Sequence, residues 1–376
     1  SFVKGHPRQL IRDSTNFTLT VVVFVHEYGH YYFARRYGVG VTDFSIGFGK
    51  EIFGFNDKSG TRWKFCAIPL GGYVKFFGDR NVFSQAEQEA LLQKYNKNDQ
   101  KRLFVTKPLY QRSLVVAAGP LANFILAIFI FSLIYMIAGK DFTPAQIQEV
   151  QKNSPAYIAG IQKDDVILSI NKNKVQSILD VSTYINASTE EIIDLEILRN
   201  NNELTIPVKP KVVEGKDSLG NDVNKKIIGI KISPLNNEFN RQRLGPATAL
   251  FYAVKETWFV TKTSINFIFS IFKGKADKNQ LGGPIKIAKI TGQVAQHGII
   301  AFLSIMAYIS ISLGFINLFP IPMLDGGHLM FYAFEKILGR PLKQKTQEGF
   351  FRIGLILLFS LMFFTTFNDL KDLGLF

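Results

Sequence analysis

The chain has 376 residues, and its hydrophobic fraction of 47%, its 35 phenylalanines and its mean hydropathy of +0.11 exceed the balance of a typical soluble protein. The charged fraction of 20% places large parts of the chain in water, so the composition predicts a polytopic membrane protein with an aqueous domain. A net charge of +14 is compatible with nucleic-acid binding, but no nucleic-acid motif appears and membrane topology explains the charge better. Cys66, the only cysteine, excludes an intrachain disulfide and a zinc site of several thiolates.

An apolar run in the predicted spanning helix 17–37 leads directly into His26-Glu27-Tyr28-Gly29-His30, a His-Glu-x-x-His motif. Positions i and i+4 share one face of a helix, so His26 and His30 can direct imidazole nitrogens at one metal ion. Glu27 lies beside them, where its carboxylate can act on water. Chance placement is a poor explanation, because the chain has only five histidines and unpartnered ionisable groups are costly in an apolar helix.

Residues from about 44 to 80 alternate in polarity and are interrupted by glycines and Pro69, which predicts β-strands with a turn near residues 57–60. Two interpretations of these strands stay equally open. They form an ordinary β-meander, or one of them is a sheet edge at the membrane surface that pairs with an extended substrate backbone.

A second span is predicted over 114–138, with Asn123 as its one strongly polar side chain. Asn123 either packs against another helix through its amide or belongs to a functional site, and the sequence favours neither.

The chain changes character at 141–235, where charged, β-branched and asparagine residues dominate. Residues 154–171 resemble the PDZ signature of bacterial proteases, although Asp164 stands where that pattern usually has glycine. The segment predicts one PDZ-like domain, which acts as a steric filter or as a binding groove.

Residues 236–298 predict an amphipathic helical region at the membrane surface, and further spans are expected near 299–316 and 353–367.

Two prolines break the chain after the third span, and irregular backbone at membrane depth is tolerated only around a protein-lined or watery cavity. A zinc hydrolase needs three protein ligands, so Asp325, which follows the prolines, is the candidate for the third and His328 is its rival. The sequence of this break is Asn317-Leu318-Phe319-Pro320-Ile321-Pro322-Met323-Leu324-Asp325-Gly326-Gly327-His328.

These two remote motifs, in this order, resemble the site-2 protease family of intramembrane zinc proteases. The Gly119-Pro120 span, the 71–75 stretch and the PDZ-like insert resemble most closely the bacterial RseP type, the regulator of sigma-E protease, in a form with a single PDZ domain. The resemblance covers nearly everything after about residue 21. Members of this branch often carry two PDZ domains in tandem, whereas 141–235 has room for one.

The resemblance implies a polytopic α-helical membrane protein with about four transmembrane helices, a membrane-associated β-hairpin region and one inserted PDZ-like α+β domain. Residues 1–16 are expected to be a polar N-terminal segment that is suspected to be non-native. The chain is expected to divide into five segments. After residues 1–16, residues 17–140 contain the first two transmembrane helices and the β region, and residues 141–235 form the PDZ-like domain. Residues 236–298 form the amphipathic surface region, and residues 299–376 contain the last two transmembrane helices.

The resemblance also implies the site. Three residues hold Zn²⁺, Glu27 takes a proton from water and passes it to the leaving amine, and three further residues bind the substrate or the developing oxyanion. The metal ligands are His26, His30 and Asp325, and the substrate or oxyanion residues are Asn317, Gly71 and Gly72. For Asn317 a second interpretation stays open, in which its side chain only caps the broken helix.

The implied activity is hydrolysis of peptide bonds within the transmembrane segments of single-span proteins, such as anti-sigma factors or remnant signal peptides, after an upstream site-1 protease has shortened them. The implied location is the bacterial inner membrane. The basic residues of the first loop and of 336–352 favour a cytoplasmic position for these segments, with the active site towards the cytoplasm and the PDZ-like domain on the periplasmic or external side.

Two other classes compete with this interpretation. A membrane scaffold would use the PDZ-like domain to recruit partners and would need the metal only for structure, but such a site does not require Glu27. A metal transporter predicts ionisable residues along several spans, whereas the fourth predicted span has only Arg352 at its edge.

Overall fold

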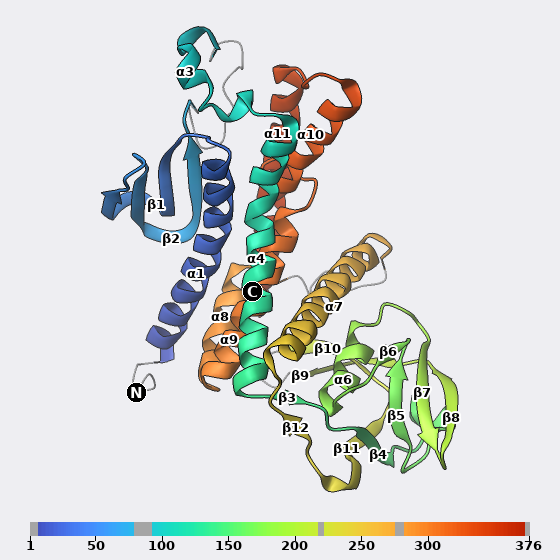
Figure 1. The fold of residues 1–376 in the computed structure, drawn as a ribbon. Helices are drawn as coiled ribbons and strands as arrows, with labels where there is room; N and C mark the ends of the chain where they lie inside the picture. The colour runs from blue at the N-terminus through green and yellow to red at the C-terminus, as the bar shows by residue number, and fades with distance from the viewer. Residues whose placement is uncertain (1–6, 79–91, 217–221, 275–281, 373–376) are drawn as a thin grey trace. The chain divides into compact units, whose positions relative to one another are not determined.

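A computed structural model describes residues 7–78, 92–216, 222–274 and 282–372. The chain divides into two compact units, one built from Ser1–Ile130 and Gly282–Phe376 and the other from Phe131–Leu281 (Figure 1). The first unit is therefore discontinuous in sequence. Parts of several predicted segments fall outside the described residues, namely positions in 1–16, 44–80, 141–235, 236–298 and 299–376.

The first unit begins with α1 (Pro7–Arg36), a helix of 30 residues that carries the His-Glu-x-x-His motif. Arg35 and Arg36 lie in its last turn, where cations interact favourably with the helix dipole. The chain then enters β1 (Val41–Asn56) and β2 (Arg62–Phe76), joined by a turn at 57–61. A buried core joins the end of α1 to these strands and to other helices of the unit. It consists of Ala34, Val39, Val41, Phe104, Val115, Val116 and Tyr332.

The two strands are long and bent, and their register makes four sheet segments out of one hairpin. Residues 43–46 pair with 72–75 on one side and with 62–65 on the other, and 62–65 pair in turn with 53–56. The order across the sheet is thus 53–56, 62–65, 43–46 and 72–76. Among the described residues, 72–76 therefore form one edge of the sheet, and this edge faces α1 (Figure 1).

Three helices of the described chain are long and apolar enough to cross a membrane: α4 (Leu109–Ile137), α9 (Ile299–Asn317) and α11 (Gln344–Asp372). They cover the predicted spans 114–138, 299–316 and 353–367, and the flanks of the last one extend it to full length. The first predicted span, 17–37, lies in α1 and is not among them, because polar and ionisable side chains interrupt its apolar run.

The remainder of the first unit connects these helices. Short turns of helix, α3 (Lys97–Gln100) and a 3-10 turn (Phe104–Thr106), precede α4. Helix α8 (Pro284–Ala295) packs against α1, α9 and α11. The Asp369 carboxylate of α11 accepts hydrogen bonds from the backbone N–H groups of Gly283, Ile285 and Lys286, so α11 caps the first turn of α8. Helix α10 (Asp325–Leu338) ends at Gly339, which has a left-handed φ of 68°.

The second unit centres on a six-stranded sheet of order β11-β4-β5-β7-β8, with β6 paired to β5. Its core is a cluster of isoleucine, leucine, valine and alanine side chains. Asp164 has a left-handed φ of 69°, which explains why glycine suits this position. The strands are β4 (Ala145–Val150), β5 (Val166–Ile170), β6 (Asn173–Lys174), β7 (Ile193–Arg199), β8 (Asn202–Val208) and β11 (Ile230–Pro234).

Two helices, α5 (Pro155–Ile158) and α6 (Ile178–Ala187), belong to this sheet domain, and β9 (Lys211–Lys216) pairs with β10 (Asp222–Ile227). The chain enters the domain through β3 (Lys140–Asp141) and leaves it through β12 (Arg241–Gln242), after a 3-10 turn at Leu235–Asn237. These two short strands pair with each other, so the two ends of the inserted segment lie together. The predicted surface region 236–298 is divided, since α7 (Pro246–Phe272) belongs to this unit and α8 to the first.

Candidate active site

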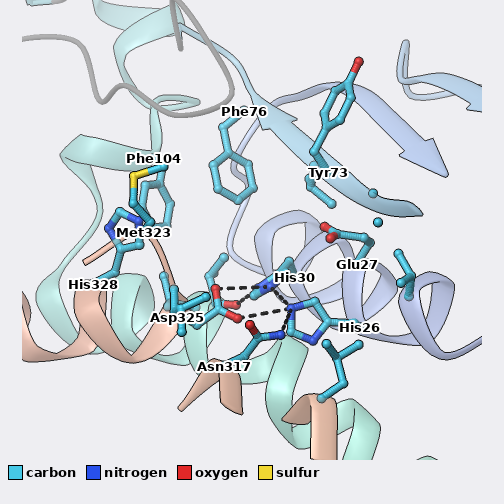
Figure 2. A pocket seen from close by; sticks show the side chains of 18 of the residues that line it. His26, Glu27, His30, Tyr73, Phe76, Phe104, Asn317, Met323, Asp325 and His328 are labelled. Carbon is cyan, nitrogen blue, oxygen red and sulfur yellow. Dashed lines mark hydrogen bonds and ion pairs between the residues drawn. The ribbon is translucent and has the colours of Figure 1, made fainter. Parts of the chain in front are cut away.

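Helix α1 presents two histidines from successive turns to one point. The Nε2 atoms of His26 and His30 lie 3.2 Å apart, and the two rings are nearly perpendicular. His26 is buried, with 7% of its surface exposed. The helical spacing predicted from the sequence therefore brings both imidazoles to a common position, as Figure 2 shows.

The first residue of α10, Asp325, completes the group. Its Oδ2 lies 3.1 Å from Nε2 of His26, and its Oδ1 lies 3.5 Å from Nε2 of His30 (Figure 2). Asp325 reaches this place because α9 ends at Asn317 and the proline-containing segment turns the chain before α10 begins. Met323 takes a left-handed φ of 90° in this turn.

The three side chains fit a tetrahedral zinc ion. Zinc binds imidazole nitrogen and carboxylate oxygen at about 2.0–2.2 Å, so neighbouring ligand atoms of a tetrahedral site lie about 3.3–3.5 Å apart. The measured separations of 3.1, 3.2 and 3.5 Å lie close to that range. Among the described residues, His26, His30 and Asp325 form a group that can hold a metal ion.

The site opens into a cavity of about 330 Å³, lined by α1, β2, α4, α9, α10 and α11. Glu27 lines it on the side of β2 and stands apart from the hydrogen-bonded group of histidines, Asp325 and Asn317 (Figure 2). Gly72 permits this arrangement, because a Cβ there would approach Cγ of Glu27 to 3.0 Å and Cγ1 of Val23 to 2.9 Å. The carboxylate is thus free to meet water or substrate in the cavity.

The other predicted residues also line this cavity. Asn317, the last residue of α9, places Nδ2 3.5 Å from Nε2 of His26. Gly71 and Gly72 lie on the wall formed by β2. His328 lines the cavity too, but its ring packs against Phe351 with 5.6 Å between centroids, outside the group of three residues that can hold a metal ion.

Two contacts behind the histidines were not assigned from the sequence. Nδ1 of His30 lies 2.9 Å from the backbone oxygen of Val115, and Nδ1 of His26 lies 3.2 Å from the side-chain nitrogen of Asn123. The sequence offered no signal for Val115, since every residue has a carbonyl group. It did single out Asn123 as a polar residue in an apolar span, without deciding its role.

Comparison with known proteins identifies the family of this chain. The model of peptidase family M50 matches residues 14–361. The chain belongs to peptidase family M50. Among its relatives, “Putative zinc metalloprotease Atu1380” of Agrobacterium fabrum is 42% identical over 355 residues, which cover 94% of this chain and 94% of that protein. “Metalloprotease MmpA” of Caulobacter vibrioides is 35% identical over 381 residues, covering 96% and 95% of the two chains.

This M50 chain is a zinc metalloprotease, which confirms the prediction of an enzyme and of zinc as its metal. The residues present suit that metal, since two neutral imidazoles and a carboxylate are ligands that zinc prefers. When bound, zinc polarises a substrate carbonyl and lowers the pKa of water. The scaffold and transporter interpretations are not supported by the family.

Proposed function

We propose that this M50 protease cuts peptide bonds within the membrane-spanning segments of single-span proteins, as a member of the RseP type with a single PDZ-like domain. The observation that carries the proposal is the position of Asn317. This residue is the last of α9, a helix apolar enough to span a membrane, and its amide lies 3.5 Å from a histidine of the metal group. A catalytic group attached to the end of such a helix suits a substrate that is itself in the bilayer.

In this proposal Glu27 takes a proton from water and passes it to the leaving amine. Its place on the cavity wall, beside Gly72 and clear of the metal ligands, supports that role. Asn317 donates a hydrogen bond from Nδ2 to the substrate carbonyl as negative charge develops on it. His26, His30 and Asp325 hold the zinc.

The substrate segment must be extended before its bonds are accessible, because the carbonyl groups of a helix are already hydrogen-bonded. The edge segment 72–76 lines the cavity and can accept an additional strand through its backbone groups. Gly71 and Gly72 belong to this wall and would lie against the substrate backbone. Helix-breaking residues in the substrate lower the free energy needed to unwind it.

The substrate class we infer is anti-sigma factors or remnant signal peptides, shortened first by a site-1 protease. The PDZ-like domain would face the periplasm and exclude uncut substrates by size, and the active site would lie towards the cytoplasmic side of the inner membrane. The basic residues of the first loop and of 336–352 support this orientation.

The test is cleavage of a tagged single-span substrate, shortened on its outer side, by reconstituted wild type and Glu27→Gln, with zinc quantified in both. We expect zinc in both proteins and cleavage within the span by wild type alone, while Glu149→Gln, a change in an exposed carboxylate of β4, cleaves as wild type does. Zinc-loaded wild type that fails on a panel of helix-destabilised substrates would contradict the proposal. Equal cleavage by wild type and Glu27→Gln would remove Glu27 from the mechanism.

A further inference from the structure

Helix α4 lies behind the metal group and contacts the far nitrogen of each histidine. Nδ1 of His30 is 2.9 Å from the carbonyl oxygen of Val115, and Nδ1 of His26 is 3.2 Å from the amide of Asn123. In both rings the opposite atom, Nε2, is the one that points to Asp325. One helix therefore contacts both imidazoles on the side away from the metal.

The contact to Val115 fixes the proton of His30. A carbonyl oxygen only accepts hydrogen bonds, so Nδ1 of His30 carries the hydrogen, and in the neutral ring Nε2 then keeps its lone pair for a metal. Gly119 allows the helices to approach closely enough, because a Cβ at this position would overlap the His30 ring.

His26 needs the same arrangement, but the amide of Asn123 faces its Nδ1 with a nitrogen, which is not an acceptor. A neutral imidazole that binds a metal through Nε2 carries its hydrogen on Nδ1 and requires an acceptor there. The atom of Asn123 that faces Nδ1 is the donor Nδ2, while the acceptor Oδ1 is buried without a hydrogen-bond partner among the described residues. The two ends of an amide have nearly the same shape, so a half-turn of the amide exchanges them.

We propose that Oδ1 of Asn123 accepts a hydrogen bond from Nδ1–H of His26 and so orients this imidazole, with Nε2 free, for zinc. Asn123 is thus a positioning residue of the metal centre, and α4 supplies the orienting acceptor for both histidines through Asn123 and the Val115 carbonyl. Acceptors of this kind, behind ligating histidines, typically change metal affinity by about 10- to 100-fold when removed.

Asn123 lies where α4 and α9 pack closely together. The residue is fully buried, and its backbone oxygen accepts a hydrogen bond of 2.8 Å from Oγ of Ser310 on α9. Gly314 brings α9 against the same turn of α4, since a Cβ there would lie 3.2 Å from Cβ of Asn123. An amide buried in this way can hold the imidazole in one orientation. The competing interpretation is that Asn123 only packs α4 against its neighbours.

The test measures zinc affinity by chelator competition on the full-length protein, together with the visible absorption spectrum of the Co²⁺-substituted protein. Asn123→Leu keeps the volume and removes the acceptor, whereas Asn123→Asp keeps the acceptor. We expect Asn123→Leu to weaken zinc binding by roughly 10- to 100-fold and to alter the Co²⁺ spectrum, and Asn123→Asp to retain binding within a few-fold of wild type.

Ser310→Ala is the matched control, because it removes a buried hydrogen bond to the backbone oxygen of Asn123, which helix α4 still holds in position, and leaves the amide beside the imidazole unchanged. It should leave zinc affinity and the Co²⁺ spectrum unchanged. Asn123→Ala, which adds no volume, serves as the second variant if Asn123→Leu does not fold, and it should show the same loss. Wild-type affinity in the variants without an acceptor, or an equal loss in Asn123→Asp or Ser310→Ala, would overturn the proposal and leave Asn123 as a packing residue.

Discussion

Individual side chains in the site have separate tasks. His26, His30 and Asp325 offer three ligand atoms within 4.8 Å of one another, whereas Glu27 lines the same cavity apart from them. The sequence predicts this division because adjacent residues of a helix point in directions about 100° apart. The proposed metal ligands and the proposed base can therefore be changed separately.

Loss of one ligand should remove the metal. We expect His30→Ala to weaken zinc binding by more than about 100-fold, beyond the effect of residues that only orient a ligand, and to abolish proteolysis. Metal analysis after competition with a chelator measures the change. His297→Ala, which alters an exposed histidine, is the control and should bind zinc as wild type does. Retention of wild-type affinity in His30→Ala would contradict the assigned ligand set.

A second residue-scale prediction concerns Asp57 in the turn between β1 and β2. Burial opposes ionisation of this carboxyl group, but hydrogen bonds from Thr61, Trp63, Tyr31 and Ser59 outweigh burial and lower the pKa of Asp57 to about 2. An unfolded aspartate has a pKa of about 3.9. The carboxylate therefore stabilises the fold above about pH 4, and this contribution is lost as the pH falls towards 2.

We expect Asp57→Asn to lower the free energy of unfolding at pH 7 by on the order of 1 kcal/mol, because the group is partly exposed and its interactions are screened. The difference from wild type should shrink as the pH is lowered from 4 to 2.5. Thermal unfolding of the detergent-solubilised protein measures both effects, with Asp194→Asn, an exposed aspartate of β7, as the control. A difference that does not change with pH would refute the assignment.

At the scale of elements, the site depends on an ion pair that holds α4 against α10. Arg112 near the start of α4 makes two hydrogen bonds to the Glu335 carboxylate on α10, at 2.5 and 3.1 Å, and its guanidinium lies 5.0 Å from the centre of the Tyr332 ring. Both charged side chains are largely buried, with 15% and 18% exposure. The same α10 begins with Asp325, so this ion pair fixes the helix that carries the proposed third ligand.

Removing one member of this pair leaves a buried charge. We expect Arg112→Met and Glu335→Leu each to destabilise the protein by about 3 kcal/mol, and the double variant to be nearly as stable as wild type, because no unpaired charge remains. A double-mutant cycle on thermal unfolding, with zinc content measured in parallel, provides the check. Additive effects of the two single changes would show that the pair does not couple the two helices.

At the scale of the whole molecule, the catalytic unit is interrupted by the second unit. Residues 1–130 and 282–376 form the unit that contains the site, and 131–281 form the other. The paired strands β3 and β12 hold the ends of the inserted sheet domain together, through Asp141 with Arg241 and Lys140 with Gln242. An insertion with adjacent ends can be removed without stretching the chain.

If the inserted domain excludes uncut substrates by size, its removal should relax that selection. We expect a variant in which a short glycine-serine linker replaces residues 144–239 to cut the shortened single-span substrate at a rate within a few-fold of wild type, and also to cut the full-length substrate, which wild type leaves intact. The same deletion carrying Glu27→Gln is the control for background cleavage. A deletion variant that still leaves the full-length substrate intact would count against a size filter.

Much of the fold was predictable from local patterns. The spans over α4, α9 and α11 follow from long apolar runs, and the β region follows from alternation interrupted by glycine and proline. The folding of two strands into four sheet segments was not predictable, because it depends on bends and on pairing between distant residues. The first expected span, 17–37, is not among the helices that are long and apolar enough to cross a membrane, since the ionisable residues of the His-Glu-x-x-His motif interrupt the apolar run of α1.

The sequence by itself determined the chemistry of this protein: the residue types that can bind zinc, their helical spacing and the two motifs that mark an M50 protease. Only the tertiary structure decided which remote segments meet. Asp325 reaches the α1 histidines through the turn between α9 and α10, and Val115 and Asn123 reach them through the packing of α4. The physical reason is that helix periodicity is a local property, whereas contacts between remote segments depend on how whole helices pack together.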